Sequence, residues 1–128
     1  ADAMVPNLLG ATVDARTKPE RVENEQFLRK LIGTQSIATI QAALGALADR
    51  PDMSEPMQHF KKPVILVCGK EDTITPPAAM ESMAKILPQG QLVIVPEAGH
   101  LVPLEAPTVF QEAVLSFLGH LENTGERS

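Results

Sequence analysis

The segment "PVILVCG", residues 63–69, determines the fold of this chain. It is a continuous apolar run rich in β-branched residues, and such runs are typical of strands that a parallel sheet buries on both faces. A second apolar run, "QLVIV" at residues 91–95, predicts another strand. Between the two runs, apolar residues recur at helical spacing after Pro76, and they recur again after Pro107. Residues 63–118 therefore predict the order strand, helix, strand, helix, which is an α/β arrangement.

The part of the chain before residue 63 has a different pattern. Residues 19–33 and 36–48 each carry an apolar stripe at helical spacing, so we expect two helices there. Residues 1–18 are expected to be irregular, and residues 51–62 to form a loop or a short turn. We accordingly divide the chain into a helical segment at 1–62, an α/β core at 63–121 and a frayed polar tail at 122–128.

Composition excludes several classes of function. The net charge is −5 and the basic residues are scattered, whereas nucleic-acid binding needs clustered Lys and Arg. No apolar run approaches the roughly 20 residues of a membrane-spanning helix. Cys68 is the only cysteine, so no disulfide can form within the chain, and a reducing compartment such as the cytoplasm fits this composition.

Polar residues follow both predicted strands. The two strands are expected to be parallel because a helix connects them, and the carboxyl ends of parallel strands meet at one edge of the sheet. Asp72 follows the first strand and His100 follows the second, so we expect the two side chains to lie close together. An aspartate beside a histidine is the orienting pair of a nucleophilic triad. The same pair is also compatible with a metal site or with a purely structural hydrogen bond.

Three segments resemble the C-terminal part of the α/β-hydrolase family: "KKPVILVCGKEDTITPP", "QLVIVPEAGHLVPLEAP" and "TVFQEAVLSFL". In that family the triad order along the chain is Ser, Asp or Glu, then His. The resemblance implies that Asp72, in a G-x-x-D setting, is the triad acid and that His100, after Ala-Gly, is the triad histidine. Glu71 is the alternative acid, and the family spacing favours Asp72. Residues 1–62 resemble, more loosely, the cap segment and return loop of enol-lactonases and haloperoxidase-like esterases.

The nucleophile of this family is missing from the sequence. It lies in a G-x-S-x-G turn, and no serine here has glycine two positions before and two after it. The serines are Ser36, Ser54, Ser82, Ser116 and Ser128. Cys68 is interpreted as a buried strand cysteine. The resemblance thus implies the C-terminal half of the fold, without the nucleophile or the glycine-rich oxyanion loop, and we expect the chain alone to be inactive.

The activity implied by the resemblance is hydrolysis of a small-molecule ester, lactone or related carbonyl compound, with no metal or organic cofactor. Halide displacement stays open, because dehalogenases of this fold use an aspartate nucleophile. The alternative is a non-catalytic module that binds a partner or itself. Two strands leave an exposed sheet edge, which either the missing N-terminal half or self-association is expected to cover.

Three further residues have simpler interpretations. His59 and His120 are expected to have no catalytic role, and Glu105 is expected to be an acid at the start of the last helix. Met53 and Met57 could line a substrate pocket, and the sequence leaves their role open.

Overall fold

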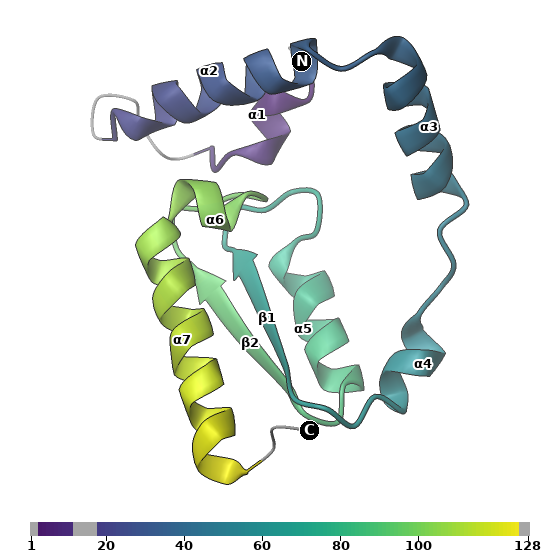
Figure 1. The fold of residues 1–128 in the computed structure, drawn as a ribbon, viewed down its shortest axis with the longest axis vertical. Coiled ribbons are helices and arrows are strands. Elements are labelled where there is room, and N and C mark those ends of the chain that lie inside the picture. Colours follow the sequence, from purple (N-terminus) through teal and green to yellow (C-terminus); the bar gives the residue numbers. More distant parts are fainter. Residues whose placement is uncertain (1–2, 12–17, 126–128) are drawn as a thin grey trace.

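The computed structural model describes residues 3–11 and 18–125 (Figure 1). The predicted order of strand, helix, strand, helix over residues 63–118 is confirmed. In chain order the described elements are α1 (Val5–Leu8), α2 (Glu20–Gly33), α3 (Ile37–Ala48), α4 (Ser54–Gln58), β1 (Val64–Gly69), α5 (Pro77–Ile86), β2 (Gly90–Val95), α6 (Val102–Glu105) and α7 (Pro107–Thr124).

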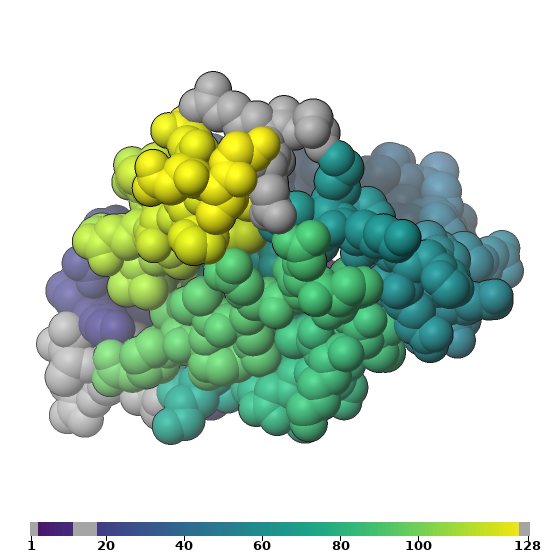
Figure 2. Space-filling view, turned by 90° about the horizontal axis from the view of Figure 1, so that it is seen from below, coloured from purple at the N-terminus to yellow at the C-terminus, as the bar shows by residue number. Residues whose placement is uncertain are grey.

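The strands β1 and β2 form a parallel two-stranded sheet. Val64 is paired with Gly90 at one end and Gly69 with Val95 at the other, so both strands end at the same edge. In Figure 1 both arrowheads point toward α6, beyond which lie α1 and α2. Figure 2 views the molecule from the opposite end, where the strands begin. The expected meeting of the two carboxyl ends is therefore confirmed.

The boundaries of the longer helices follow from local chemistry. Pro77 is the first residue of α5 and Pro107 the first of α7, a position where the missing N–H of proline costs nothing. Gly125 ends α7 with a left-handed φ of 72°, which glycine adopts without strain. Because α7 continues to Thr124, part of the predicted tail at 122–128 is helical rather than frayed. Residues 126–128 lie outside the described residues.

Three short helices were not predicted. They are α1, α4 and α6, each of four or five residues. Such a length is little more than one turn, too short for an apolar stripe to become visible in the sequence. Packing holds two of them in place, because Val5 of α1 and Val102 of α6 are buried.

Two apolar clusters flank the carboxyl ends of the strands. The first joins α1 and α2 to α6, and its buried members are Val5, Leu9 and Leu28. The second joins β2 and α6 to α7, and its buried members are Val95, Ala98 and Val102. The short helix α6 contributes to both clusters, so the segment that carries it is anchored on two sides.

The helix α3 lies apart from the rest of the molecule (Figure 1). Each of its residues is exposed, including the stripe formed by Ile37, Ile40, Leu44 and Leu47. Among the described residues, no single helix has both the length and the apolar character of a membrane span. Only α2 and α3 taken together, with a bend of 100° between them, meet that requirement.

Candidate active site

Asp72 and His100 are in direct contact. The histidine Nδ1 lies 2.9 Å from Oδ2 of the aspartate. A carboxylate can only accept a hydrogen bond, so Nδ1 carries the proton and donates it, which leaves Nε2 free to accept. The Asp72 side chain is 4% exposed and that of His100 is 32% exposed. The acid is thus buried behind a histidine that is accessible from solvent.

The turn after β1 holds the Asp72 carboxylate rigidly. Oδ1 accepts the backbone N–H groups of Ile74 and Thr75, each at 2.9 Å. Oδ2 accepts the Thr75 hydroxyl at 2.9 Å in addition to the histidine. Burial alone raises the pKa of the Asp72 carboxyl, but these hydrogen bonds, led by the backbone N–H of Thr75, together hold its pKa below the ordinary value. Asp72 is therefore poised to remain ionised.

The loops that carry the two residues are joined through their backbones. The Lys70 N–H donates to the Val95 carbonyl at 2.8 Å, and the Glu71 N–H donates to the Ala98 carbonyl at 2.9 Å. A Cβ on Gly69 would overlap the carbonyl oxygens of Ala98 and Gly99. Glycine at position 69 therefore lets the end of β1 closely approach the loop that carries His100, residues 96–101, here called the histidine loop.

Glu105 contacts the histidine loop, which the sequence did not suggest. Its Oε2 accepts the N–H groups of Gly99 at 3.0 Å and Leu101 at 3.3 Å, and its Oε1 accepts the Gly10 N–H at 2.6 Å. The prediction of an acid at the start of the last helix was wrong, because Glu105 is the last residue of α6. The extra helix α6 turns its side chain back toward His100.

Cys68, considered as a nucleophile, and Glu71, considered as the acid, do not contact the His100 imidazole in the structure. Cys68 is 2% exposed, which confirms a buried strand cysteine, and its Sγ faces the Gly69 carbonyl at 3.3 Å. Burial raises the pKa of the Cys68 thiol, and the nearby charge of Asp72 adds to this, so the reactive thiolate is disfavoured. The Glu71 carboxylate lies beside Gly10, 2.7 Å from the position that a Cβ would occupy there. The acid that holds Nδ1 of His100 is Asp72.

The serines of the described part do not bond to His100. Ser36 caps α3 by accepting the Thr39 N–H, Ser54 donates to Asp52, and Ser82 donates to the carbonyl of Ala78. Ser128 lies outside the described residues. Within residues 3–11 and 18–125, no three His, Cys, Asp or Glu side chains come together in a way that could hold a metal ion.

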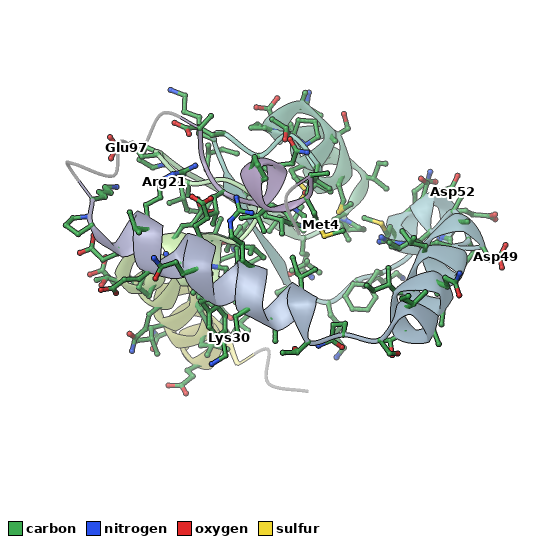
Figure 3. All side chains as sticks on the ribbon, turned by 90° about the horizontal axis from the view of Figure 1, so that it is seen from above. Met4, Arg21, Lys30, Asp49, Asp52 and Glu97 are labelled. Carbon is green, nitrogen blue, oxygen red and sulfur yellow. The ribbon has the colours of Figure 1, made fainter. Side chains whose placement is uncertain are left out.

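A cavity of about 500 Å³ lies between the start of α2 and the segment from Glu97 to Pro107. Arg21 and Glu97, labelled in Figure 3, contribute to its wall together with Glu105. Asp72 and His100 do not line it. This cavity is therefore distinct from the accessible edge of the histidine.

Replacing Thr75 with Val is expected to raise the pKa of Asp72 and to lower the free energy of unfolding at pH 7 by about 1.5 kcal/mol, the size of one hydrogen bond to a charged group. Because the folded-state pKa of Asp72 is lowered, its stabilising contribution is present above the unfolded-state pKa and is lost as pH falls through the folded value. The deficit should therefore shrink on acidification.

Urea denaturation between pH 7 and pH 3 measures this effect. Thr73→Val is the matched control, since Thr73 is exposed and lies in the same turn. A deficit of the same size at every pH would mean that Thr75 acts through packing and not through the Asp72 charge.

Comparison with known proteins shows similarity to hydrolases of the alpha/beta hydrolase fold. A family model described as alpha/beta hydrolase fold matches residues 11–107. Over 73 residues the chain is 37% identical to a pimeloyl-[acyl-carrier protein] methyl ester esterase of Nitrosomonas europaea. Over 83 residues it is 30% identical to the sn-1-specific diacylglycerol lipase ABHD11 of Mus musculus. A solved structure of a thermophilic esterase from Thermogutta terrifontis aligns with a TM-score of 0.84 and 32% identity.

These similarities cover most of this chain but a minor part of each relative. The match to the Nitrosomonas enzyme spans 57% of this chain and 29% of that protein, and the match to the mouse lipase spans 65% and 26%. The Thermogutta alignment covers 94% of this chain and 43% of the esterase. The chain thus spans less than half the length of the relatives it matches.

Proposed function

The chain belongs to the α/β-hydrolase family, and we propose that Asp72 and His100 are the acid and the base of a catalytic triad. The observation that carries the proposal is the 2.9 Å hydrogen bond from His100 Nδ1 to the buried Asp72 carboxylate. This bond fixes the tautomer that leaves Nε2 unprotonated, which is the form a general base requires. The low pKa of Asp72 keeps the acid charged when the imidazole becomes an imidazolium.

In this proposal the reaction is acyl transfer in two steps. Nε2 of His100 takes the proton of a serine hydroxyl while the serine oxygen attacks the substrate carbonyl carbon. The imidazolium, stabilised by Asp72, then gives that proton to the leaving alcohol, and an acyl-enzyme remains. In the second step Nε2 takes a proton from water while the water oxygen attacks the acyl carbon. The bond from that carbon to the serine oxygen then breaks, the acid leaves, and the imidazolium returns its proton to the serine oxygen.

We place the nucleophile outside these 128 residues. The sequence contains no G-x-S-x-G turn, and the chain covers 43% of the esterase that it resembles in structure. The glycine-rich loop that supplies oxyanion donors in this family would also lie outside these 128 residues. An aspartate at the nucleophile position would instead give halide displacement, so the residue at that position decides the reaction.

The substrate class in this proposal is a small-molecule ester or lactone. Support comes from the relatives described above, one named a methyl ester esterase, one a diacylglycerol lipase and one an esterase. The partly exposed edge of His100 is consistent with a substrate that approaches from solvent or from beneath a cap.

The 128-residue chain alone is expected to show no saturable hydrolysis of p-nitrophenyl butyrate that depends on His100. Without a nucleophile and oxyanion donors, an acid–base pair contributes only residual catalysis. The assay compares the chain with its His100→Ala variant over a range of substrate concentrations. Saturable turnover that disappears in the variant would place a working nucleophile within these residues and sink the proposal.

A second candidate function, self-association without catalysis, is favoured by one observation. The exposed stripe on α3 is apolar along its whole length, and contiguous apolar surface of this kind marks interaction sites. Light scattering on the same sample discriminates the two candidates. A dimer that dissociates on Leu44→Lys supports self-association, whereas a folded monomer argues against it.

A further inference from the structure

We propose that Glu105 is a positioning residue that holds the His100 loop in the geometry required for the Asp72 contact. The inference rests on the proposed function, since it assigns Glu105 a role for a histidine taken to be the base. To the proposed pair of Asp72 and His100 it adds the Glu105 carboxylate. This group does not contact the His100 side chain, and it binds the backbone on both sides of His100.

The contacts of Glu105 surround His100 in the sequence. One oxygen, Oε2, accepts the N–H of the residue before it, Gly99, and of the residue after it, Leu101. The N–H of His100 itself donates to the Leu8 carbonyl at 2.9 Å. Three consecutive N–H groups are thus bound by acceptors that lie outside the loop. Unpaired, each such group would cost free energy wherever water is excluded.

The position of Glu105 is set by packing on both sides of α6. Val102 belongs to the apolar cluster with β2 and α7, whereas Leu104 packs against the cluster with α1 and α2. A four-residue helix held by two cores cannot easily rotate or shift. Its last side chain is therefore a fixed point from which the loop is held.

The same carboxylate joins the loop to the N-terminal segment. Oε1 accepts the Gly10 N–H, and the Gly10 carbonyl accepts a hydrogen bond from the Arg21 guanidinium of α2. Gly99 packs directly on this segment, because a Cβ there would lie 2.6 Å from the Gly10 nitrogen. Glu105 is therefore bonded to two segments that pack against each other, residues 8–10 and residues 99–101 of the histidine loop. We call this arrangement the clamp.

The histidine loop, residues 96–101, needs such a clamp because Glu97 within it is strained. Glu97 has φ of 53°, a conformation that a residue with a Cβ rarely adopts and that surrounding contacts must maintain. If the carboxylate is removed, Gly99 and Leu101 lose their acceptor and the loop can relax. The imidazole then moves relative to Asp72, and the Nδ1–H tautomer is no longer enforced.

The first measurement is the tautomer of the neutral His100 ring by ¹⁵N NMR in the 128-residue chain. We expect the Nδ1–H form to dominate in the wild type and to give way to a mixture in Glu105→Ala. Glu105→Gln, which keeps the side-chain size and one acceptor oxygen, is expected to restore most of the Nδ1–H form. Glu112→Ala, an exposed position on α7, is the matched control. A folded Glu105→Ala chain with the wild-type tautomer would overturn the inference.

Amide hydrogen exchange in Glu105→Gln keeps the test decisive where Glu105→Ala does not fold. A neutral acceptor binds N–H groups less strongly than a carboxylate by about 1.4 kcal/mol, so exchange at Gly99 and Leu101 should be about tenfold faster. Exchange within β1 should be unchanged. Wild-type exchange at both amides would refute the clamp. Neither readout involves catalysis. Failure of the inference about Glu105 is therefore distinguishable from failure of the triad assignment, which activity measurements on His100 variants decide.

Discussion

Replacing His100 with Ala, or Asp72 with Asn, is expected to lower kcat for ester hydrolysis by about 10⁴-fold in the polypeptide translated from the whole reading frame. In the proposed mechanism, His100→Ala removes the group that accepts the nucleophile's proton. Asp72→Asn leaves the shape of the site intact but replaces an acceptor with an amide, whose NH₂ group can donate to Nδ1 and so favour the wrong tautomer. Both changes act on the same 2.9 Å contact, so the double variant should be little worse than either single one.

Steady-state kinetics with p-nitrophenyl butyrate measures this loss. His120→Ala is the matched control, because His120 lies exposed on α7 and takes no part in the site. The KM should change little in either site variant, since the lost interactions concern the transition state. A His100→Ala enzyme within tenfold of the wild-type kcat would exclude His100 as the base.

Gly69→Ala is expected to lower the free energy of unfolding by about 3 kcal/mol, the upper part of the range for overpacking. The new Cβ would overlap the carbonyl oxygens of Ala98 and Gly99 and would lie 2.6 Å from the carbonyl carbon of Ala98. All three atoms belong to the backbone, so no side chain can rotate away. The end of β1 and the histidine loop must separate, which also moves His100 away from Asp72.

Urea denaturation at pH 7 gives the size of this effect, and Gly119→Ala provides a control of opposite sign. Nothing lies within 4 Å of a Cβ placed on Gly119, in the interior of α7, so alanine there should stabilise the chain by about 0.5 to 1 kcal/mol. A Gly69→Ala variant as stable as the wild type would show that the two loops are not packed as described.

The contact between Asp72 and His100 was predictable because the sequence signals that lead to it are local. The apolar run at residues 63–69 identifies a buried strand, and the helix that follows it forces the next strand to run parallel. These two facts bring Asp72 and His100 to one edge of the sheet without any knowledge of contacts. In the sequence, only the family spacing favours Asp72 over Glu71 as the partner of His100. In the structure the carboxylate that contacts His100 is that of Asp72, which Thr75 also binds.

The contacts of Glu105 were not predictable in the same way. Its partners include Gly10, 95 positions earlier in the chain, and no periodic pattern reports a contact over such a separation. The helix α6 that aims the side chain is a single turn, shaped by two apolar clusters whose members come from distant segments. The exposure of α3 was equally unpredictable, since its apolar stripe has the spacing of a helix that packs against a neighbour.

Labelling with a fluorophosphonate tests the central claim most directly, because the reagent phosphonylates a serine that a histidine base activates. The polypeptide from the whole reading frame is treated with the reagent, with and without His100→Ala, and the modified residue is located by peptide mass spectrometry. We expect one modified serine, outside the 128 residues described above, and loss of its labelling in His100→Ala. Labelling of a serine within these residues, or labelling that is undiminished in His100→Ala, would contradict the account.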